Sequence, residues 1–312
     1  MNCNISVVIP THNRMAVLTR CLEALTLQTT LPDLFDVVLV DDGSKDGTEE
    51  VVSKWQKSSN IRINYFYQQA RGPASARNLG VREASRSIVL FLGDDILPAT
   101  NLLEEHIKVH ELHPDDSVAV LGFVTWSPEI KVTHFMRWLE NGGPQFGYRT
   151  IQDPANVPWT FLYTANISFK RDFLLKNGLF DEDFPYAAYE DIELGHRLAQ
   201  KGMRIVYNPK AIGHHFHPTG LRQALGRMEK VGYSYGLYRS KIGQGLDSRI
   251  GCDNGIRGII GELKFWLYQR MGFFLERRVV VPAIYAYLMD KARSKGLKQY
   301  VKLAGHCVGS PS

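Results

Sequence analysis

Residues 88–95 read Ile-Val-Leu-Phe-Leu-Gly-Asp-Asp, an apolar run followed by a glycine and two adjacent carboxylates. A short apolar run that ends at a glycine is typical of a strand buried on both faces of a parallel sheet. Adjacent carboxylates at such a strand end suit Mg²⁺ or Mn²⁺, which share their shell with waters and substrate phosphates. The alternative is a helix cap ahead of Pro98. We favour the metal site, because carboxylates at the end of a buried strand need a partner.

The same pattern recurs upstream. Short β-branched, apolar runs predict strands at 5–9, 35–40 and 61–67. Apolar residues at helical spacing, or a proline in the first turn, predict helices at 15–27 and 73–84. This alternation predicts an α/β domain with a mostly parallel central sheet flanked by helices. Ligands bind beyond the carboxyl ends of such strands. Three polar clusters lie at these ends: Thr11–Arg14, Asp41–Ser44 and Gly93–Asp95. The first cluster lacks a Gly-x-Gly-x-x-Gly pattern, which argues against a dinucleotide-binding fold.

Downstream, the pattern is less regular. It predicts helices at 99–113 and 190–200, strands at 119–126, 163–169, 205–207 and 211–216, and a long loop at 141–158. From residue 220 onward the sequence is helical and basic.

Several polar residues at predicted element ends have two interpretations each. Asp41 and Asp42 could bind a base or a ribose, or form an Asx turn with Ser44 or Asp46 capping the next helix. Arg77 has the planar guanidinium that pairs with phosphate or a base carbonyl; the alternative is that it is a surface residue.

The carboxylates at 190, 191 and 193 lie in the first turn of a predicted helix, where the helix dipole favours acidic residues. A carboxylate there could also deprotonate a sugar hydroxyl.

The densest histidine cluster is His214-His215-Phe216-His217. On a strand, His215 and His217 share one face and His214 points to the other, so one of them could ligate a metal. Zinc is disfavoured because no cysteine lies near. His106 and His110 lie one helical turn apart without the glutamate of a metalloprotease helix, and we expect them at the surface.

Composition narrows the class of protein. The 312 residues are 44% hydrophobic and 22% charged, which is typical of a folded globular protein. The four cysteines are scattered and the N-terminus lacks a signal-peptide pattern, so we expect reduced thiols in the cytoplasm. The net charge is +5, yet residues 257–312 carry ten Lys/Arg against three Asp/Glu. This basic, aromatic-rich tail is either a solvated surface or a contact with an anionic membrane.

Five blocks together resemble the family 2 glycosyltransferases of the GT-A fold. They are Val7–Arg14, Val40–Ser44, Ala76–Gly80, Phe91–Asp95 and Glu190–Leu194, and the resemblance covers roughly residues 4–220. It implies a catalytic domain at 1–220, with a nucleotide-sugar-binding half at about 1–98 and an acceptor half at about 99–220. Residues 221–312 would be a basic helical extension.

The resemblance also implies roles for matched positions. The base pocket would be lined by Pro10, Thr11, Arg14 and Asp41. Arg77 would lie near the base or diphosphate, and Asp94 near the ribose or donor sugar. Asp95 would hold the metal. Either His214 or His217 would assist, and His214 is the better match to the family pattern. Asp191 would be the catalytic base, and Glu190 would hold acceptor or donor hydroxyls. Gly93 departs from the pattern, because many relatives carry an aspartate there.

The implied activity is transfer of a sugar, with inversion, from a nucleotide diphosphate sugar (UDP-linked in particular) to the hydroxyl of a sugar or lipid-linked acceptor. It would use Mn²⁺ or Mg²⁺, serve polysaccharide, cell-envelope or glycolipid synthesis, and involve no nucleic acid. The enzyme would be cytoplasmic, with a peripheral membrane contact through the tail. The alternative is a nucleotide-sugar-binding module without turnover. A nucleotidyltransferase would need a glycine-rich basic phosphate loop after the first strand, and His12-Asn13 offers none.

Overall fold

The computed structural model describes residues 4–244, 256–275 and 281–304, without the side chains of 256–262 and 275. The chain forms two compact units. The first comprises residues 1–130, 148–183 and 190–217, and the second comprises 131–147, 184–189 and the chain from 218 on. The C-terminal helices therefore share their unit with two short segments from the preceding chain.

An eight-stranded sheet in the order β3-β2-β1-β4-β7-β6-β8-β5 is the centre of the first unit. The strands are β1 (Ile5–Thr11), β2 (Phe35–Asp41), β3 (Ile63–Tyr67), β4 (Ile88–Leu92), β5 (Ile96–Pro98), β6 (Val118–Trp126), β7 (Asn166–Lys170) and β8 (Arg204–His215). Strands β1 to β4 run parallel, whereas β7 is antiparallel to β4 and β6, and β5 is antiparallel to β8. Strands β6 and β8 also pair in parallel. The predicted α/β class is confirmed, with a mixed sheet in which β7 and β5 are the antiparallel strands.

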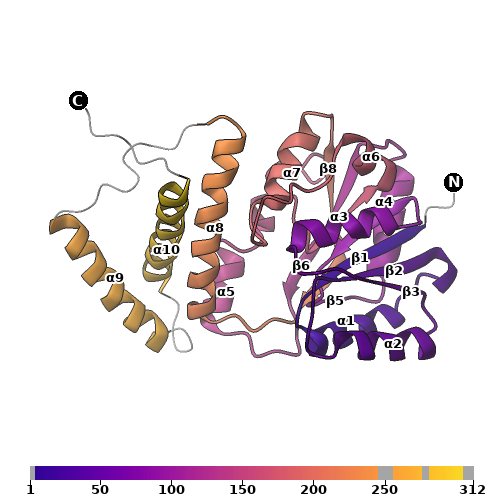
Figure 1. Cartoon of the computed structure of the whole chain (residues 1–312), viewed down its shortest axis with the longest axis horizontal. Helices are drawn as coiled ribbons and strands as arrows, with labels where there is room; N and C mark the ends of the chain where they lie inside the picture. Colours follow the sequence, from indigo (N-terminus) through magenta and orange to yellow (C-terminus); the bar gives the residue numbers. More distant parts are fainter. Residues whose placement is uncertain (1–3, 245–255, 276–280, 305–312) are drawn as a thin grey trace. The chain divides into compact units, whose positions relative to one another are not determined.

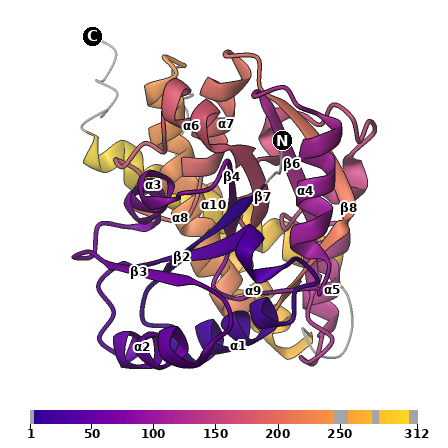
Figure 2. The ribbon, with the colours of Figure 1, turned by 90° about the vertical axis from the view of Figure 1, so that its right-hand side faces the viewer.

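Helices cover both faces of this sheet. They are α1 (Met15–Thr26), α2 (Thr48–Ser58), α3 (Pro73–Glu83), α4 (Leu102–Leu112), α6 (Arg171–Asn177) and α7 (Glu190–Ala199). Short 3₁₀ turns lie at Pro32–Leu34, Tyr148–Thr150 and Trp159–Phe161. Helices α1 and α2 lie on one side of the parallel strands and α3 on the other (Figures 1 and 2). All five residues of β4 are buried, as their apolar run predicts.

The two strands predicted at 205–207 and 211–216 form one strand, β8, with an irregularity inside it. Gly122 of β6 pairs with Asn208, but the next residue, Phe123, pairs with Ile212. The side-chain amide of Asn166 donates to the carbonyls of Phe123 and Ala211 at this point, at 3.2 and 2.9 Å. The strand continues because a side chain from β7 satisfies backbone groups that the ladder cannot pair.

The prediction that His106 and His110 lie at the surface is wrong, because both are fully buried on α4. Nε2 of His106 lies 2.9 Å from Oδ1 of Asn166, and its Nδ1 lies 2.8 Å from Oγ of Ser168. His110 reaches the same hydroxyl at 2.9 Å through Nε2. Strand β7 directs the polar side chains of Asn166 and Ser168 toward α4. The buried face of α4 therefore carries two histidines where an apolar pair would otherwise pack.

The second unit is helical. Its helices are α5 (His134–Asn141), α8 (Leu221–Lys241), α9 (Ile256–Leu275) and α10 (Pro282–Leu303). Helices α8 and α10 approach closely, since a Cβ on Gly232 would lie 1.8 Å from the carbonyl of Arg293. The ring of Phe135 on α5 packs against Tyr285 of α10, 5.0 Å between centroids. Among the described helices of the chain, none is both long and apolar enough to cross a bilayer.

One free thiol lies in the described part of the chain. Cys21 is buried on α1, and burial, with the nearby carboxylates, raises the pKa of its thiol well above its usual value. The other three cysteines lie outside the described residues.

Candidate active site

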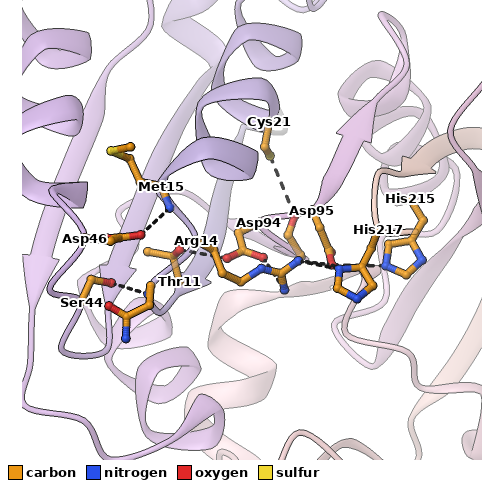
Figure 3. A network of polar contacts seen from close by, with 12 residues as sticks. Thr11, Arg14, Met15, Cys21, Ser44, Asp46, Asp94, Asp95, His215 and His217 are labelled. Atoms are coloured by element: carbon orange, nitrogen blue, oxygen red, sulfur yellow. Dashed lines mark hydrogen bonds and ion pairs between the residues drawn. The ribbon is translucent and has the colours of Figure 1, made fainter. Parts of the chain in front are cut away.

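The carboxylates that follow β4 are held by a guanidinium from the start of α1. Arg14 contacts Asp94 through Nη1 at 3.2 Å and Asp95 through Nη2 at 2.7 Å (Figure 3). The hydroxyl of Thr11, the last residue of β1, donates to Oδ2 of Asp94 at 2.9 Å. Thr11 and Arg14, from one sequence block, therefore meet Asp94 and Asp95, from another, at the carboxyl edge of the parallel strands.

Two histidines approach the same carboxylate. Nε2 of His215 lies 3.2 Å from Oδ2 of Asp95, and Nδ1 of His217 lies 3.9 Å from it. The two rings stack with centroids 5.7 Å apart. The pairing of β5 with β8 sets His215 opposite Ile96, the residue after Asp95. Figure 3 shows both imidazoles directed toward the aspartates.

His214, the preferred match by resemblance, lies in a different environment. It is half-buried, and burial lowers the pKa of its imidazole, which the charge of Glu129 offsets only in part. His215 was not selected from the sequence. The strand alternation that grouped it with His217 was the signal that could have found it.

The two aspartates have opposite electrostatic environments. Burial and the negative charge of Asp95 raise the pKa of Asp94, and Arg14 and Thr11 offset this only in part. Burial also acts against ionisation of Asp95, but a hydrogen bond from His215, its charge and the charge of Arg14 together lower the pKa of that carboxyl. Asp95 is therefore the member of the pair that ionises more readily.

The loops after β1 and β2 are joined by polar contacts. Asp41, opposite Thr11 in the sheet, accepts from the backbone N–H of Ser44 at 2.7 Å and from the hydroxyl of Tyr65 at 2.8 Å. Ser44 in turn accepts from the N–H of Asn13 at 2.8 Å. Pro10 lies half-buried in β1 beside these residues. The three predicted base-pocket positions Pro10, Thr11 and Asp41 thus lie together at the carboxyl ends of β1 and β2.

Two further carboxylates, those of Asp42 and Asp46, connect the loops at this edge of the sheet. Asp42 accepts from the N–H groups of Arg71 and Gly72, both at 2.8 Å, and so anchors the loop before α3. The predicted cap of α2 by Asp46 or Ser44 is wrong, because the cap residue is Gly47 and has no side chain. Asp46 instead accepts from the N–H of Met15, at the start of α1, at 2.9 Å. Its Oδ1 accepts from the hydroxyl of Thr48, the first residue of α2, at 2.6 Å, so this carboxylate joins the start of α1 to the start of α2.

Arg77 and Glu190 form a buried ion pair. Nη1 of Arg77 lies 2.8 Å from Oε1 of Glu190, and the two side chains are 10% and 2% exposed. The guanidinium also lies over the ring of Phe180 at 5.5 Å. Oε2 of Glu190 and Nε of Arg77 have no hydrogen-bond partner among the described residues. This pair connects the start of α3 with the start of α7.

The acidic residues that open α7 point in different directions. Glu193 pairs with Arg197 on its own helix at 2.6 Å. Asp191 is half-buried, and its Oδ1 accepts from the N–H of Ile192 at 2.8 Å. Of the acids at 190, 191 and 193, Asp191 is the one that is half-buried, whereas Glu190 and Glu193 are buried.

The donor set around Asp95 fits a divalent cation that is shared with a substrate. One carboxylate oxygen has two imidazole nitrogens within 3.9 Å. Within the ranges that the structure describes, no three His, Cys, Asp or Glu side chains converge tightly enough to hold an ion alone. Mg²⁺ and Mn²⁺ are commonly held by one or two carboxylates together with phosphate oxygens, so the residues present fit such an ion.

Family comparison decides the identity. The profile of glycosyl transferase family 2 matches residues 6–178, more than half of the chain, and includes both aspartates after β4. The chain belongs to glycosyl transferase family 2. A second profile, glycosyl transferase family group 2, matches residues 100–286 of this family 2 chain.

Two curated relatives illustrate the family. The chain is 33% identical over 241 residues to validoxylamine A glucosyltransferase of Streptomyces hygroscopicus subsp. limoneus, covering 67% of the chain and 51% of that protein. It is 28% identical over 269 residues to chondroitin synthase of Escherichia coli, covering 76% of the chain and 38% of the relative. This family 2 chain thus spans about half the length, or less, of these relatives.

Solved structures confirm the predicted GT-A fold. A mannosyltransferase of Pyrobaculum calidifontis in complex with GDP-Man and Mn²⁺ aligns with a TM-score of 0.58 at 19% identity, covering 97% of this chain and 86% of that one. S. aureus TarS 1-349 in complex with UDP-GlcNAc aligns with a TM-score of 0.57 at 18% identity, covering 97% and 92%. At these identities, the likeness establishes the fold of this family 2 glycosyltransferase and nothing finer.

Proposed function

We propose that this chain transfers one sugar, with inversion, from a nucleotide diphosphate sugar to the hydroxyl of a sugar or lipid-linked acceptor. The proposed donor is UDP-linked, and the proposed setting is polysaccharide, cell-envelope or glycolipid synthesis in the cytoplasm. The observation that carries the proposal is the Asp94–Asp95 pair held by Arg14 at the carboxyl edge of the parallel strands. Relatives named as a glucosyltransferase and as chondroitin and hyaluronan synthases support sugar transfer.

Asp95, with His215 and His217 beside it, would hold Mn²⁺ or Mg²⁺. The contacts of 3.2 and 3.9 Å to one carboxylate oxygen support this assignment. Such an ion stabilises the charge that develops on a diphosphate leaving group. Arg14 contributes a second positive charge at the same point, and Thr11 orients Asp94 through its 2.9 Å hydrogen bond. Asp94 would then face the ribose or the donor sugar.

Asp191 would act as the general base toward the acceptor hydroxyl. A base must change its proton content, and Glu190 is poorly suited because protonation would leave Arg77 as an unpaired buried cation. Asp191 lies next in the chain and is half-buried, which leaves it accessible to a substrate. In this scheme Glu190 and Arg77 set the start of α7, and direct displacement opposite the diphosphate inverts the anomeric centre.

A donor panel tests the proposal. UDP-glucose, UDP-N-acetylglucosamine and GDP-mannose are each incubated with the chain and Mn²⁺ or Mg²⁺, and release of the nucleoside diphosphate is measured. We expect release from a UDP-linked donor, its loss in EDTA, and recovery on adding metal.

Asp95→Asn should weaken binding of the nucleotide diphosphate and lower the rate, whereas Asp172→Asn, at an exposed carboxylate of α6, should change neither. Full activity in chelator would overturn the metal assignment. Saturable nucleotide binding without release from any donor would favour the alternative, a binding module.

A further inference from the structure

Helix α9 turns an apolar face to solvent. Five large side chains on it are 40–65% exposed: Leu263, Trp266, Leu267, Met271 and Phe274. Their spacing of three, four, eight and eleven residues from the first puts them on a single stripe of the helix. A surface helix normally presents charged or polar residues to water. We call these five residues the α9 stripe.

The opposite face of α9 is the one that packs within the second unit. Gly272 is buried, and a Cβ there would lie 2.6 Å from Leu221 of α8 and 3.2 Å from Leu288 of α10. The ring of Tyr268 packs against Tyr287 of α10 with centroids 5.3 Å apart. Helix α9 therefore packs within its unit through this opposite face, while the five side chains of the α9 stripe remain 40–65% exposed.

Cations lie within and beside the α9 stripe. The guanidinium of Arg270 lies over the ring of Trp266 at 4.4 Å, and the ammonium of Lys264 lies 4.9 Å from the ring of Tyr287. Residues 263–274 contain no acid. Helices α8, α9 and α10 together carry thirteen Lys/Arg against three Asp/Glu. Exposed Lys298 and Lys302 on α10 belong to this set.

We propose that the α9 stripe docks the chain onto an anionic lipid bilayer, with α9 lying in the plane of the interface. The stripe spans about 16 Å at 1.5 Å per residue, so it can insert its side chains below the headgroups without crossing the bilayer. Arg270 and Lys264 have long stems that extend along apolar surface and leave the charge among the headgroups. Each such cation adds attraction to an anionic surface.

The charge pattern favours a bilayer over a second copy of the chain. A symmetric pair formed through the α9 stripe would bring Arg270 and Lys264 toward the same cations of its partner, with no acid on the stripe to neutralise them. Anionic lipid supplies the opposite charge and the apolar phase at once. This inference does not depend on the proposed transfer reaction.

Vesicle flotation tests the inference. The chain is mixed with vesicles of phosphatidylcholine alone, or of phosphatidylcholine with phosphatidylglycerol, at low and high salt. We expect it to float with the anionic vesicles at low salt and to be released at high salt, because surface attraction is screened. Equal recovery with neutral and anionic vesicles would overturn the proposal.

Matched double variants locate the surface. Leu263→Glu with Phe274→Glu should weaken partition onto anionic vesicles by at least about tenfold, because two charges replace inserted apolar groups. Leu27→Glu with Leu112→Glu alters two apolar side chains of the first unit that are at least as exposed, at 65% and 76%, and should leave partition unchanged. Equal losses in both variants, or in neither, would show that the α9 stripe is not the docking surface.

Fluorescence supplies a readout that is specific for insertion. We expect the wild-type emission to shift to the blue on anionic vesicles, and we expect Trp266→Phe to retain binding while losing most of that shift. Circular dichroism and release of nucleotide from a soluble donor establish that each variant is folded. If the wild-type chain formed a concentration-dependent dimer, and Leu263→Glu/Phe274→Glu abolished that dimer, the α9 stripe would be a self-association surface and the membrane proposal would be overturned.

Discussion

The side-chain amide of Asn166 donates to the carbonyl of Ala211 at 2.9 Å, across a break in the pairing of β6 with β8. Asn166 lies opposite Leu92, the last residue of β4, and so connects the strand that carries the aspartates with the strand that carries His215. Its Oδ1 is held by His106 at 2.9 Å. One amide thereby joins the carboxyl end of β4 to the part of β8 that leads to His215.

Replacing this amide should destabilise the protein. Asn166→Asp puts a second acceptor against the carbonyls of Phe123 and Ala211, and we expect the free energy of unfolding to fall by about 2–4 kcal/mol. The matched control is Asn177→Asp, whose amide donates to one carbonyl in its own helix at 2.9 Å and is half-buried. Urea unfolding measures both, and an equal loss would contradict this role for Asn166.

The buried histidines of α4 should make stability depend on pH. Burial lowers the pKa of His106 to about 4 and that of His110 to about 2, the latter with help from the charges of His106 and Lys170. Below about pH 6.5 the unfolded chain binds protons at these positions and the folded chain does not, so stability is present above that pH and is lost as pH falls.

We expect the free energy of unfolding to drop by more than about 1 kcal/mol between pH 7.5 and 5.5 through these two residues. The double variant His106→Gln/His110→Gln should remove that part of the dependence. Parallel urea curves at the two pH values measure it. If the double variant lost as much free energy of unfolding between pH 7.5 and 5.5 as the wild type, groups other than these histidines would cause the pH dependence.

The neighbouring histidines should differ in their effect on metal binding. Nε2 of His215 lies 3.2 Å from Asp95, whereas His214 is influenced by Glu129 instead. We expect His215→Gln to weaken Mn²⁺ binding in the presence of UDP by at least about tenfold, and His214→Gln to have little effect. Electron paramagnetic resonance of free Mn²⁺ measures this without turnover, and the reverse order would restore His214 as the ligand.

The carboxylates at the start of α7 should separate stability from turnover. Glu190→Gln leaves the buried Arg77 without its counter-charge, and we expect a loss of about 3–5 kcal/mol in the free energy of unfolding. Asp191→Asn should keep stability and donor binding but lower turnover by roughly 10²–10⁴-fold, the usual contribution of a general base.

Thermal unfolding and donor turnover are measured on both variants, and the anomer of the product is read by nuclear magnetic resonance. Near-normal turnover in Asp191→Asn, or a product with retained configuration, would show that the base or the mechanism is misassigned.

The sequence by itself determined the elements around residues 88–95. An apolar run long enough for one strand, a glycine and two aspartates predict a buried strand with acids at its end, and β4 begins and ends where that run does. Alternating strand and helix patterns likewise predict that Thr11 and Asp94 share an edge of the sheet. These features are local in the chain, because hydrophobic period and turn residues act over a few positions.

Only the tertiary structure decided which partner each polar side chain takes. His106 and His110 read as surface residues, yet Asn166 and Ser168 of a distant strand give them buried partners. His215 rather than His214 reaches Asp95, because β5 pairs with β8 in one register and a shift by one residue would reverse the faces. Such pairings join segments that are more than fifty residues apart, and no periodicity within either segment encodes the other.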